Sequence, residues 1–426
     1  MSQNLALPRL LYINYSRGYM ATTDVLIIGG GLAGLTASAI LAKAGKQVVL
    51  LEKAATLGGR SRTQHQSDFC LNLGPHALYQ QGIAARTYRE LGLQIVGGEP
   101  KVAQGSVYSR DTLQPIPFSP LTLLRSSLFT WTEKWETIRS LQRLTSLNPI
   151  EQRGRTMAEW LAVNVRGESV KAFFQAVLRL ATYCADLELL DAGLAIEQFQ
   201  LSLGGVLYLD RGWQTLVDGL VGISQQFGAK LLTAQQISKV KISGSFPTVE
   251  LADGNTITAA HVILATDPTT VQQLLGVEFP TIPIRAACLD LALRRLPQPD
   301  RTFAIGLDRP FYYSVHSAYS KLAPESGAVV HVARYLRHDD DLPATELRSQ
   351  LEAFLDRLQP GWQQEVIHAR FMPNLAVAQD LPGKKSIEIE MPNIHLAGDW
   401  VGDKGMLSDR AVASAIAATQ RILHAL

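Results

Sequence analysis

Continuous apolar runs mark the first structured part of the chain. Val25–Ile28 is one such run, and Gln47–Leu51 contains a second that ends at Glu52. Runs of this kind are typical of strands buried on both faces of a parallel sheet. The Ala-rich stretch Leu35–Ala44 lies between them and stops before Gly45, which predicts a helix with a glycine cap. Together they predict a βαβ crossover unit.

The hydrophobic pattern changes twice further along the chain. Residues 76–204 show mainly helical periodicity, at Ala84–Leu91, Thr132–Leu144, Met157–Val165 and Ser169–Tyr183. From about residue 205 the β-type pattern returns. Short alternating segments around the Asp253-Gly254 turn predict a β-hairpin or meander, with Val262–Leu264 as a separate strand. The segments are Lys230–Leu232, Ile237–Ile242, Thr248–Leu251 and Thr256–Thr258. Near the end, Ile394–Leu396 precedes an Ala-rich helix from about Asp409.

These patterns predict an α/β fold in which one nucleotide-binding domain is assembled from three segments. The segments are 22–75, 205–284 and 386–426, and an inserted α+β substrate domain is formed by 76–204 and 285–385. Residues 1–21 are predicted to be a disordered extension, or the result of a start codon upstream of Met20.

Composition narrows the class of protein. Of the 426 residues, 46% are hydrophobic, and 40 basic and 38 acidic residues are spread along the chain without a basic block, so nucleic acid is not an expected partner. Cys70, Cys184 and Cys288 lie far apart, which predicts no disulfide framework, no metal site and a reducing, cytoplasmic location. No uninterrupted apolar run has the length of a transmembrane helix, and no secretory signal is expected.

The turn after the first strand carries a dinucleotide-binding pattern. Gly29, Gly31 and Gly34 satisfy G-x-G-x-x-G, which allows a tight turn, close approach of the backbone to a pyrophosphate, and close packing of helix on strand. The helix N-terminus favours the pyrophosphate anion. Glu52 lies 23 positions after Gly29, where a carboxylate would bond ribose hydroxyls and disfavour a 2′-phosphate.

A second motif distinguishes between NAD and FAD as the bound nucleotide. Gly58-Gly59-Arg60 follows Glu52 by six residues, and with the preceding fingerprint it resembles the flavin-dependent amine oxidase and phytoene desaturase superfamily. The resemblance covers roughly residues 24–76, 205–270 and 393–422 and implies a Rossmann-type, glutathione-reductase-like three-layer domain that binds FAD. It implies that Arg60 lies by the FAD phosphates, where a guanidinium makes charge-assisted bonds. Residues 385–426 contain no cysteine, so the FAD is expected to be non-covalent.

The same resemblance implies the other cofactor contacts. The segment Gly398-Asp399 matches the family's closing motif, in which the aspartate bonds the ribityl chain, and the next helix N-terminus stabilises negative charge on the reduced flavin. The full set of expected FAD contacts is Gly29, Gly31, Leu32, Ala33, Gly34, Glu52, Lys53, Gly59, Arg60, Gly74, Pro75, His76, Ile237, Gly398, Asp399, Met406, Leu407 and Ser408.

Catalytic residues are not identified by any motif. His76 follows the turn expected to pass the isoalloxazine ring and is either a proton donor or acceptor, or a histidine tied into a local hydrogen-bond network. Trp400, directly after Asp399, is a candidate neighbour of the ring. The apolar, Pro-flanked segment Phe118–Trp135 is either an ordinary packed helix or a peripheral membrane contact.

The resemblance implies an FAD-dependent oxidoreductase of the desaturase or dehydrogenase type. It would take hydride from an apolar organic substrate to flavin N5 and pass electrons to oxygen or a quinone. Open alternatives are an amine oxidase acting on a small amine and a redox-neutral isomerase. A non-catalytic FAD-binding protein is less favoured. Neither the substrate nor the oligomeric state follows from the sequence.

Overall fold

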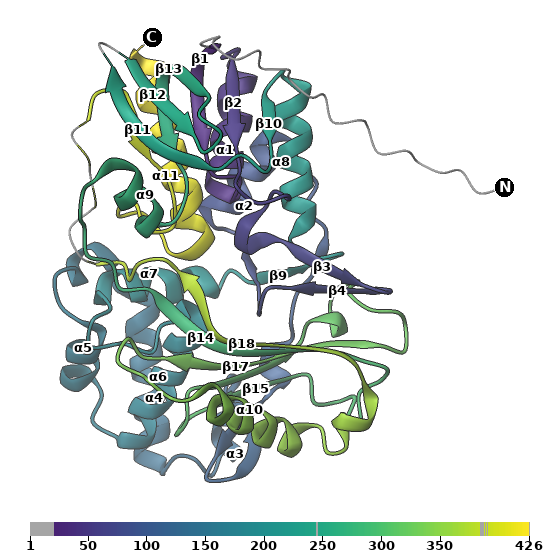
Figure 1. Cartoon of the computed structure of the whole chain (residues 1–426). Helices are drawn as coiled ribbons and strands as arrows, with labels where there is room; N and C mark the ends of the chain where they lie inside the picture. The colour runs from purple at the N-terminus through teal and green to yellow at the C-terminus, as the bar shows by residue number, and fades with distance from the viewer. Residues whose placement is uncertain (1–20, 244–245, 384–386, 388, 390, 426) are drawn as a thin grey trace.

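Two large sheets organise the chain (Figure 1). The computed structural model describes every residue except 1–20, 244–245, 384–386, 388, 390 and 426. The predicted N-terminal extension, residues 1–21, therefore lies almost entirely outside the described residues. No helix in the described part is long and apolar enough to cross a membrane.

The first sheet is built from the two ends and the middle of the chain. Its strand order is β10-β2-β1-β13-β12-β11, with β19 also paired to β13. The parallel strands are β1 (Ala21–Ile28), β2 (Val48–Leu51), β10 (Lys230–Leu232), β13 (Thr256–Leu264) and β19 (Ile394–Leu396). Antiparallel β12 (Phe246–Leu251) and β11 (Ile237–Ser243) extend it.

Both faces of this sheet are covered, which explains the apolar run in β1. Val25 and Ile27 face one hydrophobic core, and Leu26 and Ile28 face another. Successive residues of a strand point to opposite faces, so a strand between two cores must be apolar throughout. The first core is closed by α1 (Leu32–Lys43), α2 (Ile83–Leu91), α8 (Gln214–Gln226) and α11 (Leu407–Ala425), and the second by α9 (Pro268–Leu275).

The second sheet has the order β18-β14-β17-β16-β15-β7-β8. Its strands are β7 (Ser106–Ser109), β8 (Thr112–Pro115), β14 (Ile284–Leu293), β15 (Phe303–Gly306), β16 (Phe311–Val315), β17 (Ala328–Leu336) and β18 (Val366–Ala378). One face packs against α10 (Ala344–Leu358). The other packs against helices from α3 (Pro120–Arg125) and α4 (Trp131–Ser146) through α5 (Met157–Asn164) and α6 (Glu168–Thr182) to α7 (Ala192–Ser202).

Short strands connect the two large sheets. β3 (Thr63–Gln66) pairs with β4 (Phe69–Asn72), and β9 (Val206–Leu209) pairs with β5 (Leu78–Tyr79) and β6 (Gly97–Gly98). Three local predictions differ from the structure. The first strand begins at Ala21 rather than Val25, β13 is one strand where two were expected, and β10 pairs with β2 instead of joining the hairpin or meander.

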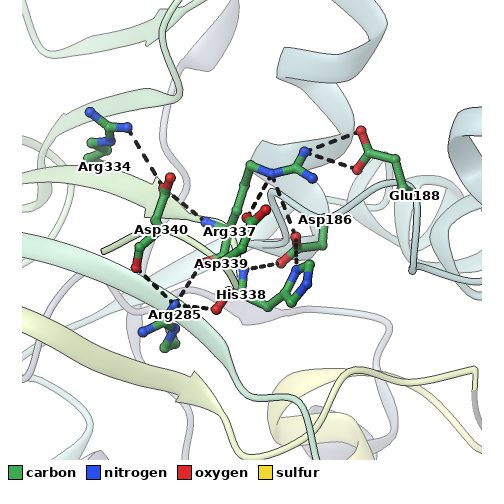
Figure 2. A network of polar contacts seen from close by, with 8 residues as sticks. All are labelled: Asp186, Glu188, Arg285, Arg334, Arg337, His338, Asp339 and Asp340. Carbon is green, nitrogen blue, oxygen red and sulfur yellow. Dashed lines mark hydrogen bonds and ion pairs between the residues drawn. The ribbon is translucent and has the colours of Figure 1, made fainter. Parts of the chain in front are cut away.

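A polar network joins the helical region to the end of β17 (Figure 2). The Asp186 carboxylate accepts from the His338 backbone N–H at 2.9 Å and from His338 Nδ1 at 2.8 Å. Asp186, His338 and Asp339 offer atoms within 4.8 Å of one another. However, Arg337 Nε lies 3.2 Å from Asp339 and 4.0 Å from Asp186, so a cation is already present between the carboxylates. We interpret the network as a structural clasp.

Replacing the central carboxylate should loosen this clasp. Asp186 is buried, and Asp186→Ala leaves the two His338 donors without their acceptor, which should lower the free energy of unfolding by about 1–2 kcal/mol. The matched control is Glu188→Ala. Glu188 is an exposed partner of Arg337, and its loss should cost below about 1 kcal/mol. Urea unfolding measures both, and equal losses would contradict the central role of Asp186.

Candidate functional site

A cavity of about 650 Å³ lies between the two sheets. On one side it is lined by the loops that follow β1, β2 and β13 at the carboxyl edge of the first sheet. On the other side it is lined by residues of β14, β17 and β18 of the second sheet. In open α/β sheets ligands bind outside the carboxyl ends of the strands, so this is the expected position for a nucleotide.

Most residues expected to contact the cofactor line this cavity. They are Gly29, Gly31, Leu32, Ala33, Glu52, Lys53, Gly59, Arg60, Pro75, His76, Ile237, Gly398, Asp399, Leu407 and Ser408. Trp400 also reaches the wall. Gly34, Gly74 and Met406 do not contribute to the lining: Gly34 packs beneath the turn, Gly74 lies between lining residues, and Met406 is buried in the hydrophobic core.

The glycines of the first turn differ in what they do. A Cβ on Gly34 would lie 2.0 Å from the Gly29 carbonyl oxygen, and a Cβ on Gly29 would lie 2.4 Å from the Ala265 carbonyl oxygen. Both positions therefore serve close packing. A Cβ on Gly31 would meet nothing within 4 Å, so this residue borders open space at the N-terminus of α1. Its free N–H groups and dipole make that space suitable for a diphosphate.

Glu52 is fixed by the backbone around it. Its carboxylate accepts from Gly30 N–H at 2.7 Å and from Ala54 N–H at 2.8 Å. A carboxylate oxygen has more than one lone pair, so these bonds orient the group and leave capacity for further donors. At the wall of the cavity, a held carboxylate suits the hydroxyls of a ribose.

Arg60 and Asp399 meet inside the cavity wall. Arg60 Nη1 donates to Asp399 Oδ2 at 2.7 Å and to the Val377 carbonyl oxygen at 2.8 Å. Burial lowers the pKa of Arg60, but Asp399 outweighs it and holds the pKa above its ordinary value. The pair therefore joins Gly58-Gly59-Arg60 to β18 and to the Gly398-Asp399 turn, in addition to bordering the cavity.

The turn after β4 forms another part of the wall. His76 Nδ1 lies 3.1 Å from the Gly74 carbonyl oxygen, and since that oxygen only accepts, Nδ1 carries the proton. Burial lowers the pKa of His76 to about 4, so the ring is neutral at neutral pH and Nε2 has no proton. The ring also packs edge-on against Trp213 at 4.8 Å. His76 is thus both tied into a local network and exposed to the cavity.

A buried carboxylate holds this turn from behind. Asp290 on β14 has 0% exposure, and it accepts from Gly74 N–H at 3.0 Å, from His331 Nδ1 at 2.6 Å and from Arg370 Nη2 at 2.6 Å. Burial alone would raise the pKa of Asp290, but His331 and Arg370 hold it below its ordinary value. Because Arg370 also bonds the Asn72 carbonyl oxygen, the wall turn is anchored to three strands of the second sheet.

In the C-terminal segment, some residues line the cavity and others are buried in the hydrophobic core. Leu407 and Ser408 line the cavity at the start of α11, whose N-terminus is the second helix end directed at the site. Trp400 has 0% exposure, stacks on Phe279 at 5.3 Å and donates from Nε1 to the Thr266 carbonyl oxygen at 2.9 Å. The Trp400 side chain is therefore mainly a core residue.

The residues at the inner end of the cavity carried no sequence signal. Tyr183 closes α6 in a left-handed conformation at φ 59°, and its hydroxyl lies 3.5 Å from the Pro75 carbonyl oxygen. Ala286, Cys288, Ala333 and Leu375 complete this end. They are ordinary core types in a helix or strand, and only the pairing of β14, β17 and β18 brings them to the cavity.

Comparison with known proteins identifies the class. The family model of flavin-containing amine oxidoreductases matches residues 32–423, and the chain belongs to this family. The family confirms the superfamily predicted from the sequence and the prediction of FAD as cofactor.

Individual relatives match less of the chain or show the fold alone. The L-amino acid oxidase Cdc18 of Crotalus durissus cumanensis is 46% identical over 72 residues, which is 17% of this chain and 14% of that protein. An oxidoreductase from Methanosarcina mazei has a TM-score of 0.76 at 17% identity, covering 93% of this chain and 100% of its own. Putrescine oxidase bound to putrescine has a TM-score of 0.72 at 16% identity, covering 95% and 100%. The mixed α/β fold is thus shared with FAD-dependent amine oxidases.

Charge placed on Gly31 should interfere with FAD binding. Gly31 has φ −80°, which any residue adopts, and open space lies beyond it, so Gly31→Asp should fold normally. Its carboxylate would face the diphosphate and weaken FAD binding by about 3 kcal/mol, on the order of a hundredfold. Flavin content and a titration of apoprotein with FAD measure the effect. Gly31→Ala is the uncharged control, and wild-type FAD affinity in Gly31→Asp would contradict the assignment.

Asp409 lies next to the site and makes the free energy of unfolding depend on pH. It follows Ser408, is buried, and accepts from Ala84 N–H at 2.8 Å. Burial raises its pKa from 3.8 to about 6, so the stability that its protonated form provides is present at low pH and is lost as pH rises through about 6. Asp409→Asn should remove this loss. The quantity to follow is the free energy of unfolding of the wild type minus that of the variant. This difference should fall by up to about 3 kcal/mol between about pH 4 and about pH 7.

Urea unfolding at a series of pH values measures this difference. Glu90→Gln, which changes an exposed carboxylate on α2, is the control and should leave the pH dependence unchanged. A wild-type pH dependence in Asp409→Asn would show that the burial of this carboxyl has no energetic consequence.

Proposed function

We propose that the protein is an FAD-dependent oxidoreductase that oxidises an uncharged, apolar organic substrate. When bound, FAD supplies a hydride acceptor at N5, and oxygen or a quinone then takes the two electrons from the reduced cofactor. Family membership supports the cofactor and the reaction class. The substrate class rests on one observation, the distribution of charge along the cavity.

Among the residues that the structure describes, charged side chains lie in one part of the cavity lining. Among the described lining residues they are Glu52, Lys53, Arg60, Asp267 and Asp399, and all belong to the segments expected to bind FAD. Segments 76–204 and 285–385 contribute the neutral residues His76, Ala77, Tyr183, Ala286, Cys288, Ala333, Leu375, Ala376, Val377 and Gln379. Burying an ion without a partner is costly, so this end disfavours a carboxylate or ammonium group and favours an apolar molecule.

The charged part of the lining fits FAD. Two helix N-termini, of α1 and α11, suit negative charge, the held carboxylate of Glu52 suits ribose hydroxyls, and Arg60 is half-exposed beside the turn of Gly31. Asp399 faces the cavity as an acceptor for hydroxyls of the ribityl chain. We propose that all the lining residues predicted from the sequence contact FAD, and that binding is non-covalent.

The inner residues would orient the substrate and exclude water. The apolar side chains Leu375 and Ala333 leave no charged group to hold water beside the reacting carbon. His76 Nε2, unprotonated at neutral pH, is the proposed acceptor for the proton that the substrate loses along with its hydride. Tyr183 is a candidate donor to an uncharged oxygen of the substrate, because among the described residues its hydroxyl makes only a long contact, with the Pro75 carbonyl oxygen.

We further propose the domain division 22–75, 205–284 and 386–426 for FAD, and 76–204 and 285–385 for substrate. Apart from the single boundary residues Ala21 and Ile284, the strands of the first sheet come from the first three segments and those of the second sheet from the last two. Helices cover one face of the first sheet. On the other face, α9 and side chains of the antiparallel β11–β12 extension share a core with β1. This arrangement supports a glutathione-reductase-like, three-layer Rossmann-type domain.

A flavin amine oxidase is the second candidate. The names of the relatives favour it, since L-amino acid oxidases match part of the sequence and putrescine oxidase shares the fold. The chain spans only 14% of the length of the first of those L-amino acid oxidases, however, and no charged side chain at the described inner end is available for an amino acid carboxylate.

Anaerobic reduction of the purified yellow holoprotein tests the substrate class. Matched panels of neutral polyenes, porphyrinogens, amino acids and diamines are mixed with it at equal concentration, and bleaching of the flavin absorption band is followed. We expect a neutral apolar compound to reduce the flavin at least about tenfold faster than any amino acid or diamine, because charged groups must be desolvated without a partner.

Photoreduction of the same samples is the control for competent bound flavin. Reduction by an amino acid or a diamine, with none by neutral compounds, would replace the proposal with the amine oxidase alternative. Photoreducible flavin that no compound bleaches would argue instead for a non-catalytic protein or a redox-neutral isomerase.

A further inference from the structure

Large apolar side chains gather on the outside of α3 and α4. Leu121 and Leu124 on α3 are 56% and 53% exposed, and Trp131 and Trp135 on α4 are 68% and 63% exposed. Figure 1 shows α3 at the end of the molecule farthest from the first sheet. We call these four residues the α3–α4 surface. Two tryptophans exposed to this degree on one helix are unusual for an ordinary solvated surface.

The two helices form one continuous surface. Lys134 is buried and donates from Nζ to the Leu124 carbonyl oxygen at 2.6 Å, which ties α4 to the end of α3. The same Nζ lies 4.8 Å from the centroid of the Trp131 ring and orients that side chain. Beneath them, Leu123 and Phe129 belong to the core cluster that also contains Cys288 and Ala286 of the inner cavity. The surface is thus rigidly supported.

Charge on this face is positive. Trp131, Trp135 and Arg139 follow one another at a spacing of four residues, so they share the exposed side of α4, and Arg125 is exposed at the end of α3. Helices α3 and α4 together carry Arg125, Lys134, Arg139 and Arg143 against two carboxylates, which leaves a net positive charge, and both carboxylates are held by backbone N–H groups. Glu133 caps the helix by accepting from Thr130 N–H, and Glu136 accepts from the backbone N–H groups of Arg166 and Gly167.

We propose that the α3–α4 surface binds the interface of a lipid bilayer that contains anionic headgroups. Tryptophan combines an apolar body with an N–H donor and is favoured at the membrane interface, while arginine pairs with lipid phosphate. Leucines and tryptophans on one side of two short helices would enter the boundary between headgroups and acyl chains without spanning it. The exposed arginines favour an anionic partner over a second copy of this chain, which would bring like charge. The two exposed tryptophans favour a lipid interface over an acidic protein surface.

Membrane binding is independent of the proposed reaction. It depends on exposed residues on the opposite side of the core from the cavity. A failure to bind vesicles would therefore not count against the proposed hydride transfer, and an inactive enzyme could still bind vesicles.

Cosedimentation of the holoprotein with vesicles tests the proposal. Vesicles of phosphatidylcholine alone and of phosphatidylcholine with phosphatidylserine are compared. We expect binding to the anionic vesicles that weakens with added salt, and a loss on the order of tenfold in the partition coefficient for each of Trp131→Ala and Trp135→Ala. Arg125→Gln with Arg139→Gln should reduce binding to the anionic vesicles and most of its salt dependence.

Phe227→Ala is the matched control, since Phe227 is 44% exposed but lies at the end of α8 on the first-sheet side. It should bind vesicles as wild type does, and all variants should retain flavin and the wild-type unfolding temperature. A variant that combines Trp131→Ala with Trp135→Ala completes the series. Equal binding by this double variant and wild type, or binding to neither vesicle, would overturn the proposal. So would a dimer, seen by sedimentation velocity, that the tryptophan variants dissociate, because the surface would then be an interface between two copies.

Discussion

The position of α1 on the first sheet depends on a backbone contact that only glycine permits. A Cβ on Gly34 would come within 2.0 Å of the Gly29 carbonyl oxygen, so any side chain would push the helix away from β1. The rest of the nucleotide side follows from this contact. α8 and α11 pack on α1 in one core, and the N-terminus of α1 is held where Gly31 and Glu52 border the cavity. Loss of the contact would displace the helix end and its anion-binding N–H groups together.

The parts of the site that the sequence predicts well are those built from short contiguous segments. Gly29, Gly31 and Glu52 belong to one βαβ unit, and Gly398-Asp399 lies directly after a strand, so chain geometry alone brings each group to the carboxyl edge of the sheet. Asp290 is different. Its bond to Gly74 crosses 216 residues and exists only because β14 packs behind the turn. No spacing rule connects two such positions, and the same holds for Tyr183.

Some strand and helix predictions were wrong for a related reason. β13 was expected to be two strands because its apolar pattern changes midway. Its first half alternates between buried and half-buried residues beside β12, and its second half, from His261 to Leu264, is buried between β1 and β19. A change of neighbours therefore produced a change of pattern within one strand. Helix α7 was missed because most of its residues are buried, so it shows no polar face to reveal a helical period.

One ion pair separates the two chemical environments of the cavity. Arg60 bonds both Asp399, in a segment that supplies charged groups, and the backbone of β18, which supplies neutral ones. Because both charges are paired with each other, they stabilise this junction without presenting a free charge to the neighbouring apolar end. In the proposed complex the helix N-termini would stabilise the diphosphate beside Arg60, and they carry no side-chain charge to attract a carboxylate substrate. The pair is thus compatible with the proposed arrangement, a polar nucleotide and an apolar substrate within one continuous space.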